Sequence, residues 1–281
     1  MPLRASQVKL GLLAVALGSL AWGFQALLFR HAPDVFSNPQ EDMSFAWYVP
    51  LFSLYVVWRE RRELVASLGG PSWSGALATV PFLAIGFLGV RGVQVRLEEL
   101  GFIGLLVTVP WTFYGRRTAG RLLFPAAFLL FCIPLATFLD VITVHLRLLA
   151  VSVAYAVLHG VGVDAIRQGT MISSASGAFS IDVAEPCSGL RSIFALLALT
   201  AGYAYFTQRT TLRKFVLFAL AVPIAILGNV ARILSICLVG TCANPRFATG
   251  FYHDYSGYVV FVVAILLMVA AGEALNRGGG R

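Results

Sequence analysis

Long apolar stretches recur along the whole 281-residue chain, and short segments with charged side chains separate them. A membrane-spanning helix needs about 20 mostly apolar residues. Eight stretches approach or reach that length, near residues 10–29, 43–58, 73–90, 100–114, 122–138, 188–206, 215–238 and 257–275. The pattern therefore predicts an all-α integral membrane protein with about eight transmembrane helices.

Basic residues set the orientation of these spans, because cytoplasmic loops of membrane proteins are enriched in Lys and Arg. Basic clusters follow the second, fourth and sixth stretches, and both chain ends are also basic. These residues are Arg59, Arg61 and Arg62; Arg116, Arg117 and Arg121; Arg209, Arg213 and Lys214; Arg4 and Lys9; and Arg277 and Arg281. We therefore expect both termini in the cytoplasm and the protein in the inner (plasma) membrane. The first apolar run is longer than the core of a signal peptide, so we interpret it as an uncleaved span.

The composition narrows the class of protein further. Hydrophobic residues make up 58% of the chain and charged residues only 12%, with a mean hydropathy of +0.82. Ordinary soluble domains have about twice that share of charged residues, which excludes a cytosolic globular enzyme, a disordered chain and a nucleic-acid-binding module. The net charge of +8 follows from the basic cytoplasmic loops. The four cysteines are too sparse for a disulfide scaffold.

The stretch 141–160 is also apolar, but it carries His145, Arg147 and His159. We interpret it as a helix that lies in the outer membrane interface. The alternative is a ninth span, which would move the basic cluster at 209–214 to the outside and so conflict with the charge pattern.

A short β-hairpin is predicted after this helix. Residues Ala178–Ala184 alternate between apolar and polar, a turn-like Ser/Gly segment precedes them, and Thr170–Ile172 is the candidate partner strand. Isolated strands are not stable in lipid, so the hairpin is expected outside the cytoplasm, at or beyond the membrane interface. The whole chain then forms a single membrane domain, 1–281. Its parts are five spans in 1–140, the interfacial helix and hairpin in 141–186, and a three-span core in 187–275.

Cys187 stands where the hairpin ends and the sixth span begins. Pro186 directly precedes it, and proline is favoured at the start of a helix. The positive end of a helix and its unpaired N–H groups stabilise a thiolate, which is the nucleophilic form of cysteine. The alternative is that Cys187 is a small buried apolar residue, as expected for Cys132 and Cys237.

Two further polar residues are predicted on the same, outer face of the membrane. Arg232 lies inside the seventh span, with Asn229 on the same helix face, and an arginine at membrane depth is costly unless it is paired or hydrated. The alternative is an arginine that extends to the outer headgroups. His253 lies just before the last span and can exchange a thiol proton near neutral pH. The alternative is an interfacial histidine among tyrosines.

Together these three residues form a coherent chemical set. A thiolate attacks a carbonyl, an imidazole transfers the proton, and a guanidinium stabilises the oxyanion or binds a substrate carboxylate. His31, His145 and His159 lack metal-ligand spacing and are expected to be structural. Glycine-rich phosphate loops and the Gly-x-Ser-x-Gly motif are absent from the sequence, so no cofactor or metal is expected.

Three motifs resemble the exosortase/archaeosortase family of integral membrane cysteine transpeptidases. They are Ala184–Ser192, Asn229–Ile233 and His253–Gly257, and the resemblance covers about 165–275. It implies that Cys187 is the nucleophile and that Arg232 and His253 complete the catalytic site. Arg191 is interpreted as a helix-surface charge and is not included. Pro186 stands where many relatives have a small residue such as Ala.

The resemblance also implies the partners. The substrates would be exported proteins that end in a short motif (Pro-Glu-Pro in the bacterial branch), one transmembrane helix and a basic tail. The enzyme would cleave near the motif, beside the membrane lipid, and pass the new carboxyl end to an unknown acceptor. The site would face the periplasm or the cell exterior.

Two other functions remain open at this level. A transporter or anion-binding membrane protein would use Arg232 to bind its substrate, although no internal repeat of the kind common in transporters is visible. A thiol-dependent acyltransferase would use Cys187 in the same nucleophilic role.

Overall fold

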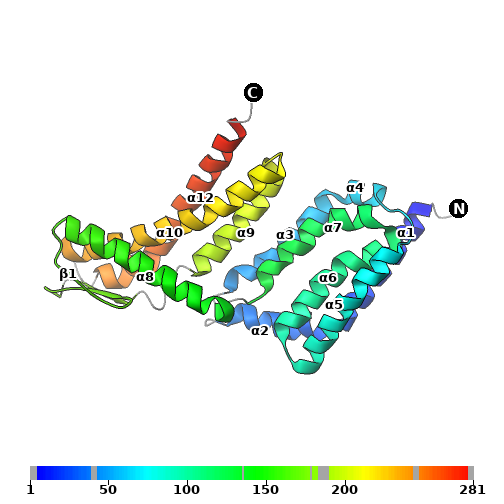
Figure 1. The fold of residues 1–281 in the computed structure, drawn as a ribbon, viewed down its shortest axis with the longest axis horizontal. Coiled ribbons are helices and arrows are strands. Elements are labelled where there is room, and N and C mark those ends of the chain that lie inside the picture. The colour runs from blue at the N-terminus through cyan, green and yellow to red at the C-terminus, as the bar shows by residue number, and fades with distance from the viewer. Residues whose placement is uncertain are drawn as a thin grey trace. The chain divides into compact units, whose positions relative to one another are not determined.

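The computed structural model describes residues 5–38, 43–134, 136–177, 179–182, 190–242 and 247–277. Nearly all of these residues are helical, and a small sheet is the exception (Figure 1). The chain divides into two compact units, Met1–Leu135 and Ala136–Arg281.

The first unit is built from helices, several of them short or irregular. In chain order these are α1 (Ala5–Gly23), the π-helix η1 (Leu27–His31), α2 (Ala32–Ser37), the 3₁₀-helix η2 (Ser44–Trp47), α3 (Tyr48–Arg59), α4 (Arg61–Ala66), α5 (Trp73–Gly92), α6 (Val95–Tyr114), α7 (Arg116–Phe128) and the 3₁₀-helix η3 (Leu129–Cys132). The first predicted span is therefore not one straight helix. The segments Gly11–Gly23 and Leu27–Ser37 are bent by 64° relative to each other.

Helices α5 and α6 pack in unusually close contact through glycines. A Cβ atom added at Gly101 of α6 would lie 2.5 Å from the Cα of Gly86 on α5. Small residues let membrane helices approach until their backbones are in van der Waals contact. The glycines at this contact therefore allow α5 and α6 to pack closely against each other.

Replacing Gly101 by alanine is expected to destabilise the protein by about 1–3 kcal/mol, the usual cost of overpacking a tight contact. The added methyl would meet backbone atoms, which cannot rotate away. Gly120→Ala is the matched control, since nothing lies within 4 Å of a Cβ at that helical position. The midpoint of thermal unfolding in detergent measures both variants. Equal midpoints for the two would contradict the close packing.

His31, expected to be structural, lies in a buried polar contact of the same unit. Its Nδ1 is 3.0 Å from Oε2 of Glu98, a side chain only 2% exposed. This contact joins the π-helix η1 to the first turn of α6. A buried polar side chain is costly without a hydrogen-bond partner, so the contact with His31 offsets part of the cost of burying the Glu98 carboxyl group. No group of three or more His, Cys, Asp or Glu residues that could hold a metal ion occurs among the described residues.

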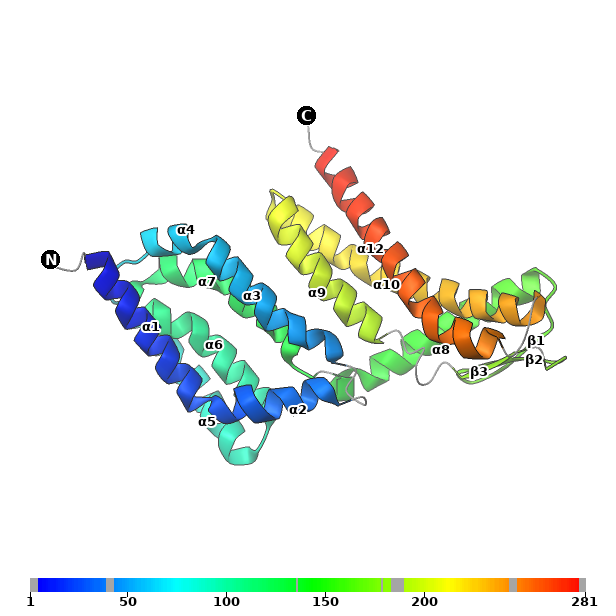
Figure 2. The same cartoon turned by 180° about the vertical axis from the view of Figure 1, so that it is seen from behind.

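The second unit combines long helices with the sheet. Its elements are α8 (Ala136–Gly160), β1 (Ala165–Gln168), β2 (Met171–Ser174), β3 (Ser180–Asp182), α9 (Leu190–Thr207), α10 (Thr211–Cys242), the π-helix η4 (Ala248–Tyr252) and α12 (His253–Arg277). Helices α9, α10 and α12 pack together through two apolar clusters, one around Leu196 and Ala225 and one around Leu217 and Met268. Figure 2 shows these helices from behind.

The sheet is antiparallel with the strand order β1-β2-β3. The predicted hairpin is confirmed by the pairing of β2 with β3, in which Ile172 stands opposite Ile181. Strand β1 is an addition that the sequence did not suggest, because only Ala165 of its four residues is buried. Ile172 and Ile181 pack into a core with residues of α8 and α10, so the sheet shares one core with these two helices.

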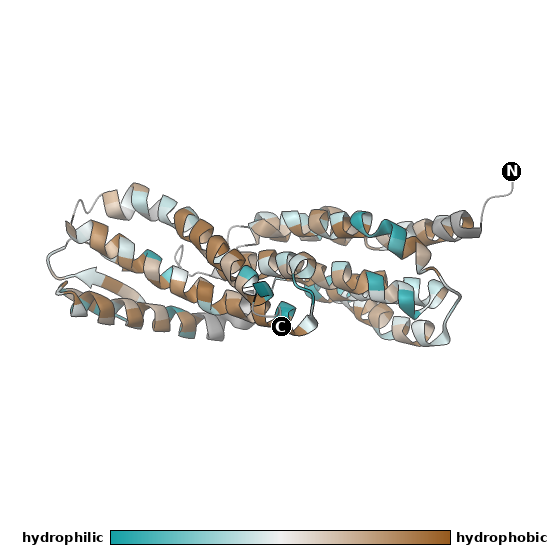
Figure 3. Ribbon diagram, turned by 90° about the horizontal axis from the view of Figure 1, so that it is seen from above, coloured by the Kyte–Doolittle hydropathy of each residue, from teal (hydrophilic) through white to brown (hydrophobic). Residues whose placement is uncertain are grey.

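The length and composition of the helices agree with the predicted membrane protein. Among the described residues, three helices are long and apolar enough to cross a membrane: Trp73–Gly92, Thr211–Cys242 and Gly250–Arg277. The bent pair at the N-terminus would be a fourth, and Val144–Gly160 and Ser192–Thr207 are shorter apolar helices. Figure 3 shows apolar residues, in brown, along most of the helices. Helices overlap all eight predicted spans, and the eight-span topology itself stays a prediction.

Candidate active site

Helix α10 presents two different faces in its C-terminal half. Val230, Ile233 and Cys237 are buried and pack in the core shared with the sheet. Asn229 and Arg232 are half-buried and lie three residues apart, on the side that faces α9 and α12. One helix therefore supports the sheet and carries the polar residues of a pocket.

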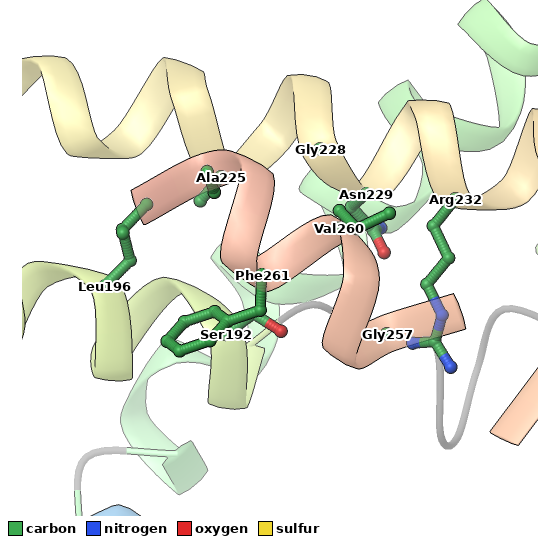
Figure 4. A pocket seen from close by; sticks show the side chains of 10 residues that line it. Ser192, Leu196, Ala225, Gly228, Asn229, Arg232, Gly257, Val260 and Phe261 are labelled. Carbon is green, nitrogen blue, oxygen red and sulfur yellow. The ribbon is translucent and has the colours of Figure 1, made fainter. Parts of the chain in front are cut away.

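The pocket lies between α9, α10 and α12, all within the second unit (Figure 4). It is lined by Ser192, Leu196, Ala225, Gly228, Asn229, Arg232, Gly257, Val260, Phe261 and Ala264. Ser192, Asn229 and Arg232 supply the polar groups, and aliphatic and aromatic side chains supply the rest. A pocket of this composition can hold one polar reacting group beside an apolar part of a ligand.

Arg232 extends from α10 to the first turn of α12. Its Nε donates a hydrogen bond of 3.2 Å to Oγ of Ser256, a side chain only 3% exposed. Its guanidinium also lies against Gly257, where an added Cβ would be 3.3 Å from Cζ. A hydrogen bond to a buried hydroxyl offsets part of the cost of placing a guanidinium at membrane depth.

The three predicted site residues are described to different extents. Arg232 is fully described and lines the pocket. His253 is the first residue of α12, three residues before Ser256, and its side chain is outside the described residues. Cys187 lies in 183–189, which the structure does not describe, and α9 begins at Leu190. The structure thus brings Arg232 to the helix turn that begins with His253, and the roles of all three residues stay predictions.

Three cysteines lie in the described part of the chain, and none of them lines the pocket. Cys132 and Cys237 are buried, as expected of small apolar residues, and Cys242 is exposed at the end of α10. Sequence reasoning missed Ser192 and Ser256 as pocket or contact residues. Both serines lie within the motifs Ala184–Ser192 and His253–Gly257, but a serine near the start of a helix is common in any sequence, and its residue type alone does not predict these contacts.

The chain is almost entirely helical, and several of its helices are long and apolar enough to cross a membrane. A pocket that contains Arg232 lies between three of the helices. These features define a helical membrane protein with an internal polar site. The family model of the transmembrane exosortases matches residues 37–270, and the chain belongs to that family. No curated protein and no solved structure matches the chain significantly. The family match confirms the resemblance seen in the three motifs and extends it over most of the first unit.

Proposed function

We propose that this exosortase-family protein is a membrane-embedded cysteine protease and transpeptidase. It cleaves the C-terminal sorting signal of exported proteins and transfers the new C-terminus to an acceptor. The observation that carries the proposal is the placement of Arg232: its guanidinium lies in a pocket where α10 meets α9 and α12. The family's motifs occur on α10, on the segment that leads into α9 and on the first turn of α12.

In the proposed reaction, the Cys187 thiolate attacks the scissile carbonyl carbon and forms a carbon–sulfur bond. The developing oxyanion is stabilised by the guanidinium of Arg232. The carbon–nitrogen bond then breaks, and the leaving amine takes a proton from the imidazolium of His253. The neutral imidazole of His253 then takes the proton of the acceptor's nucleophilic group as that group attacks the resulting thioester. The carbon–sulfur bond breaks, and the thiolate and imidazolium of the starting enzyme are restored.

The proposed topology has eight spans in the inner membrane, with both termini in the cytoplasm and the site at the outer face. The basic segment between α9 and α10 supports it, because Arg209, Arg213 and Lys214 lie at the opposite end of α10 from Arg232. A single-span substrate helix can then lie in the membrane while its motif reaches the pocket from outside.

Labelling of intact cells tests this topology. In a variant whose only cysteine is Cys187, a membrane-impermeant maleimide is expected to label the protein without lysis. The control carries Cys187→Ala and Arg209→Cys in the same background and should label only after lysis, since this loop is on the cytoplasmic side. Labelling of Cys187 only after lysis would contradict the proposed orientation.

The function is tested with a reporter. An exported protein that ends in a short motif, one transmembrane helix and a basic tail is produced together with the full chain. We expect a shorter product without the helix and tail, and mass spectrometry identifies what is attached to its new C-terminus. A reporter that stays uncleaved for every such tail in the source genome would contradict the proposed function.

A further inference from the structure

We propose that Ser256 is a positioning residue that orients the guanidinium of Arg232, and that Gly257 provides the surface against which it lies. The inference rests on the proposed function, in which Arg232 stabilises the oxyanion. Nothing in the three motifs as sequence assigns a role to either residue.

The hydrogen bond to Ser256 fixes the guanidinium through its least mobile nitrogen. Nε of Arg232 donates to Oγ of Ser256 at 3.2 Å, and the 3% exposure of Ser256 leaves the hydroxyl little access to competing water. Because Nε belongs to the rigid guanidinium plane, a bond at Nε restricts rotation of that plane about the side-chain axis. The directions of the Nη donors are therefore set by Ser256.

Gly257 limits the plane from one side. A Cβ at Gly257 would lie 3.3 Å from Cζ of Arg232 and 3.5 Å from both Nη1 and Nη2. Because the distances to the central carbon and to both outer nitrogens are nearly equal, the Cβ position of Gly257 lies over the face of the guanidinium and not at its edge. The glycine thus lets the flat face of the group lie directly against α12, and a Cβ there would require the guanidinium to shift by a few tenths of an ångström.

Oxyanion stabilisation depends on such preorganisation. A donor aids catalysis when it already points to the position where charge develops and need not reorient during the reaction. Arginine has several rotatable bonds, so a guanidinium without the contacts to Ser256 and Gly257 would sample other orientations. Ser256 also lies one helical turn after His253, which ties the placement of Arg232 to the same turn of α12.

The experiment compares variants of the purified full chain in detergent. The probe is a reporter that ends in a Pro-Glu-Pro motif, a transmembrane helix and a basic tail, and cleavage is measured against reporter concentration. Ser256→Ala is expected to lower kcat roughly 10-fold with an unchanged KM, since the lost bond involves a charged donor and acts in the transition state. Ser256→Thr keeps the hydroxyl oxygen and should recover most of the activity.

Two comparisons separate positioning from a general structural effect. Thr200→Ala removes a buried hydroxyl on α9 that has no hydrogen-bond partner among the described residues, and it should leave kcat near normal. Gly257→Ala should lower kcat although Ser256 is intact. The double variant Arg232→Lys with Ser256→Ala should be no slower than Arg232→Lys alone, because Ser256 acts through Arg232.

A normal kcat for Ser256→Ala, or losses that multiply in the double variant, would overturn the positioning role. These outcomes are distinct from failure of the proposed function. If the unmodified chain does not cleave the reporter, the proposed function is at fault. If Arg232→Lys is fully active, the proposed role of Arg232 is at fault, and the positioning role of Ser256 fails with it. If Arg232→Lys is slow while Ser256→Ala is normal, only the positioning role is wrong.

Discussion

Cys187→Ala is expected to leave a reporter substrate uncleaved, with its C-terminal helix and tail still attached. Without the thiol, no covalent intermediate forms, and the rate should fall by roughly 10³-fold or more, as for loss of a nucleophile in other covalent enzymes. The measurement is the ratio of cleaved to uncleaved reporter on a blot at matched enzyme levels. Cys242→Ala is the matched control, because Cys242 is an exposed thiol at the end of α10.

Cys187→Ser gives an independent check of the same role. A serine hydroxyl has a pKa far above neutral and is a poor nucleophile unless a strong base activates it, so this variant should be nearly as inactive as Cys187→Ala. Normal cleavage by the alanine variant would end the cysteine mechanism. Normal cleavage by the serine variant alone would point to an activating base stronger than His253.

Arg232→Lys is expected to lower turnover by roughly 10²-fold or more, the scale for loss of an oxyanion donor. Lysine keeps a positive charge but has no planar fork of donors, and its compact ammonium cannot reproduce the bond from Nε to Ser256. If Arg232 only extended to the lipid headgroups, lysine would serve equally well. Turnover is measured with the same reporter, and maleimide labelling of Cys187 reports that the fold is retained.

The control for this change is Arg209→Lys, in the exposed segment between α9 and α10. It makes the same chemical substitution away from the pocket and should leave turnover unchanged. Near-normal cleavage by Arg232→Lys would remove Arg232 from the site and leave a pair formed by Cys187 and His253.

An element can be predicted from the sequence where one of its faces is buried, because burial leaves a periodic pattern of apolar residues. The alternation around Ile181 reveals β3 because one face of the strand is buried, whereas β1 buries only Ala165 and leaves no periodic signal. The bend after Gly23 is also invisible, since the apolar run continues through it. An apolar stretch shows that a segment is compatible with lipid, but it does not show where a helix breaks.

The candidate site follows the same rule. Arg232 is conspicuous because a charge within an apolar span needs an explanation. Ser256 and Ser192 are not, since their importance depends on which residues of other helices they meet. That information comes from the packing of α9, α10 and α12, which no local pattern encodes.

The two faces of α10 have a consequence for how the protein tolerates change. Val230 and Ile233 are buried in the core that also contains Ile172 and Ile181 of the sheet, and Arg232 lies between them in sequence on the face toward the pocket. Because a helix moves as a rigid unit, a rotation of α10 that accommodates a changed side chain in this core also moves Arg232 relative to Ser256. Substitutions at Ile172 or Ile181, outside the pocket, should therefore reduce catalysis before they unfold the protein. The sheet and the pocket are therefore coupled mechanically, because α10 contributes Val230 and Ile233 to the core of the one and Arg232 to the lining of the other.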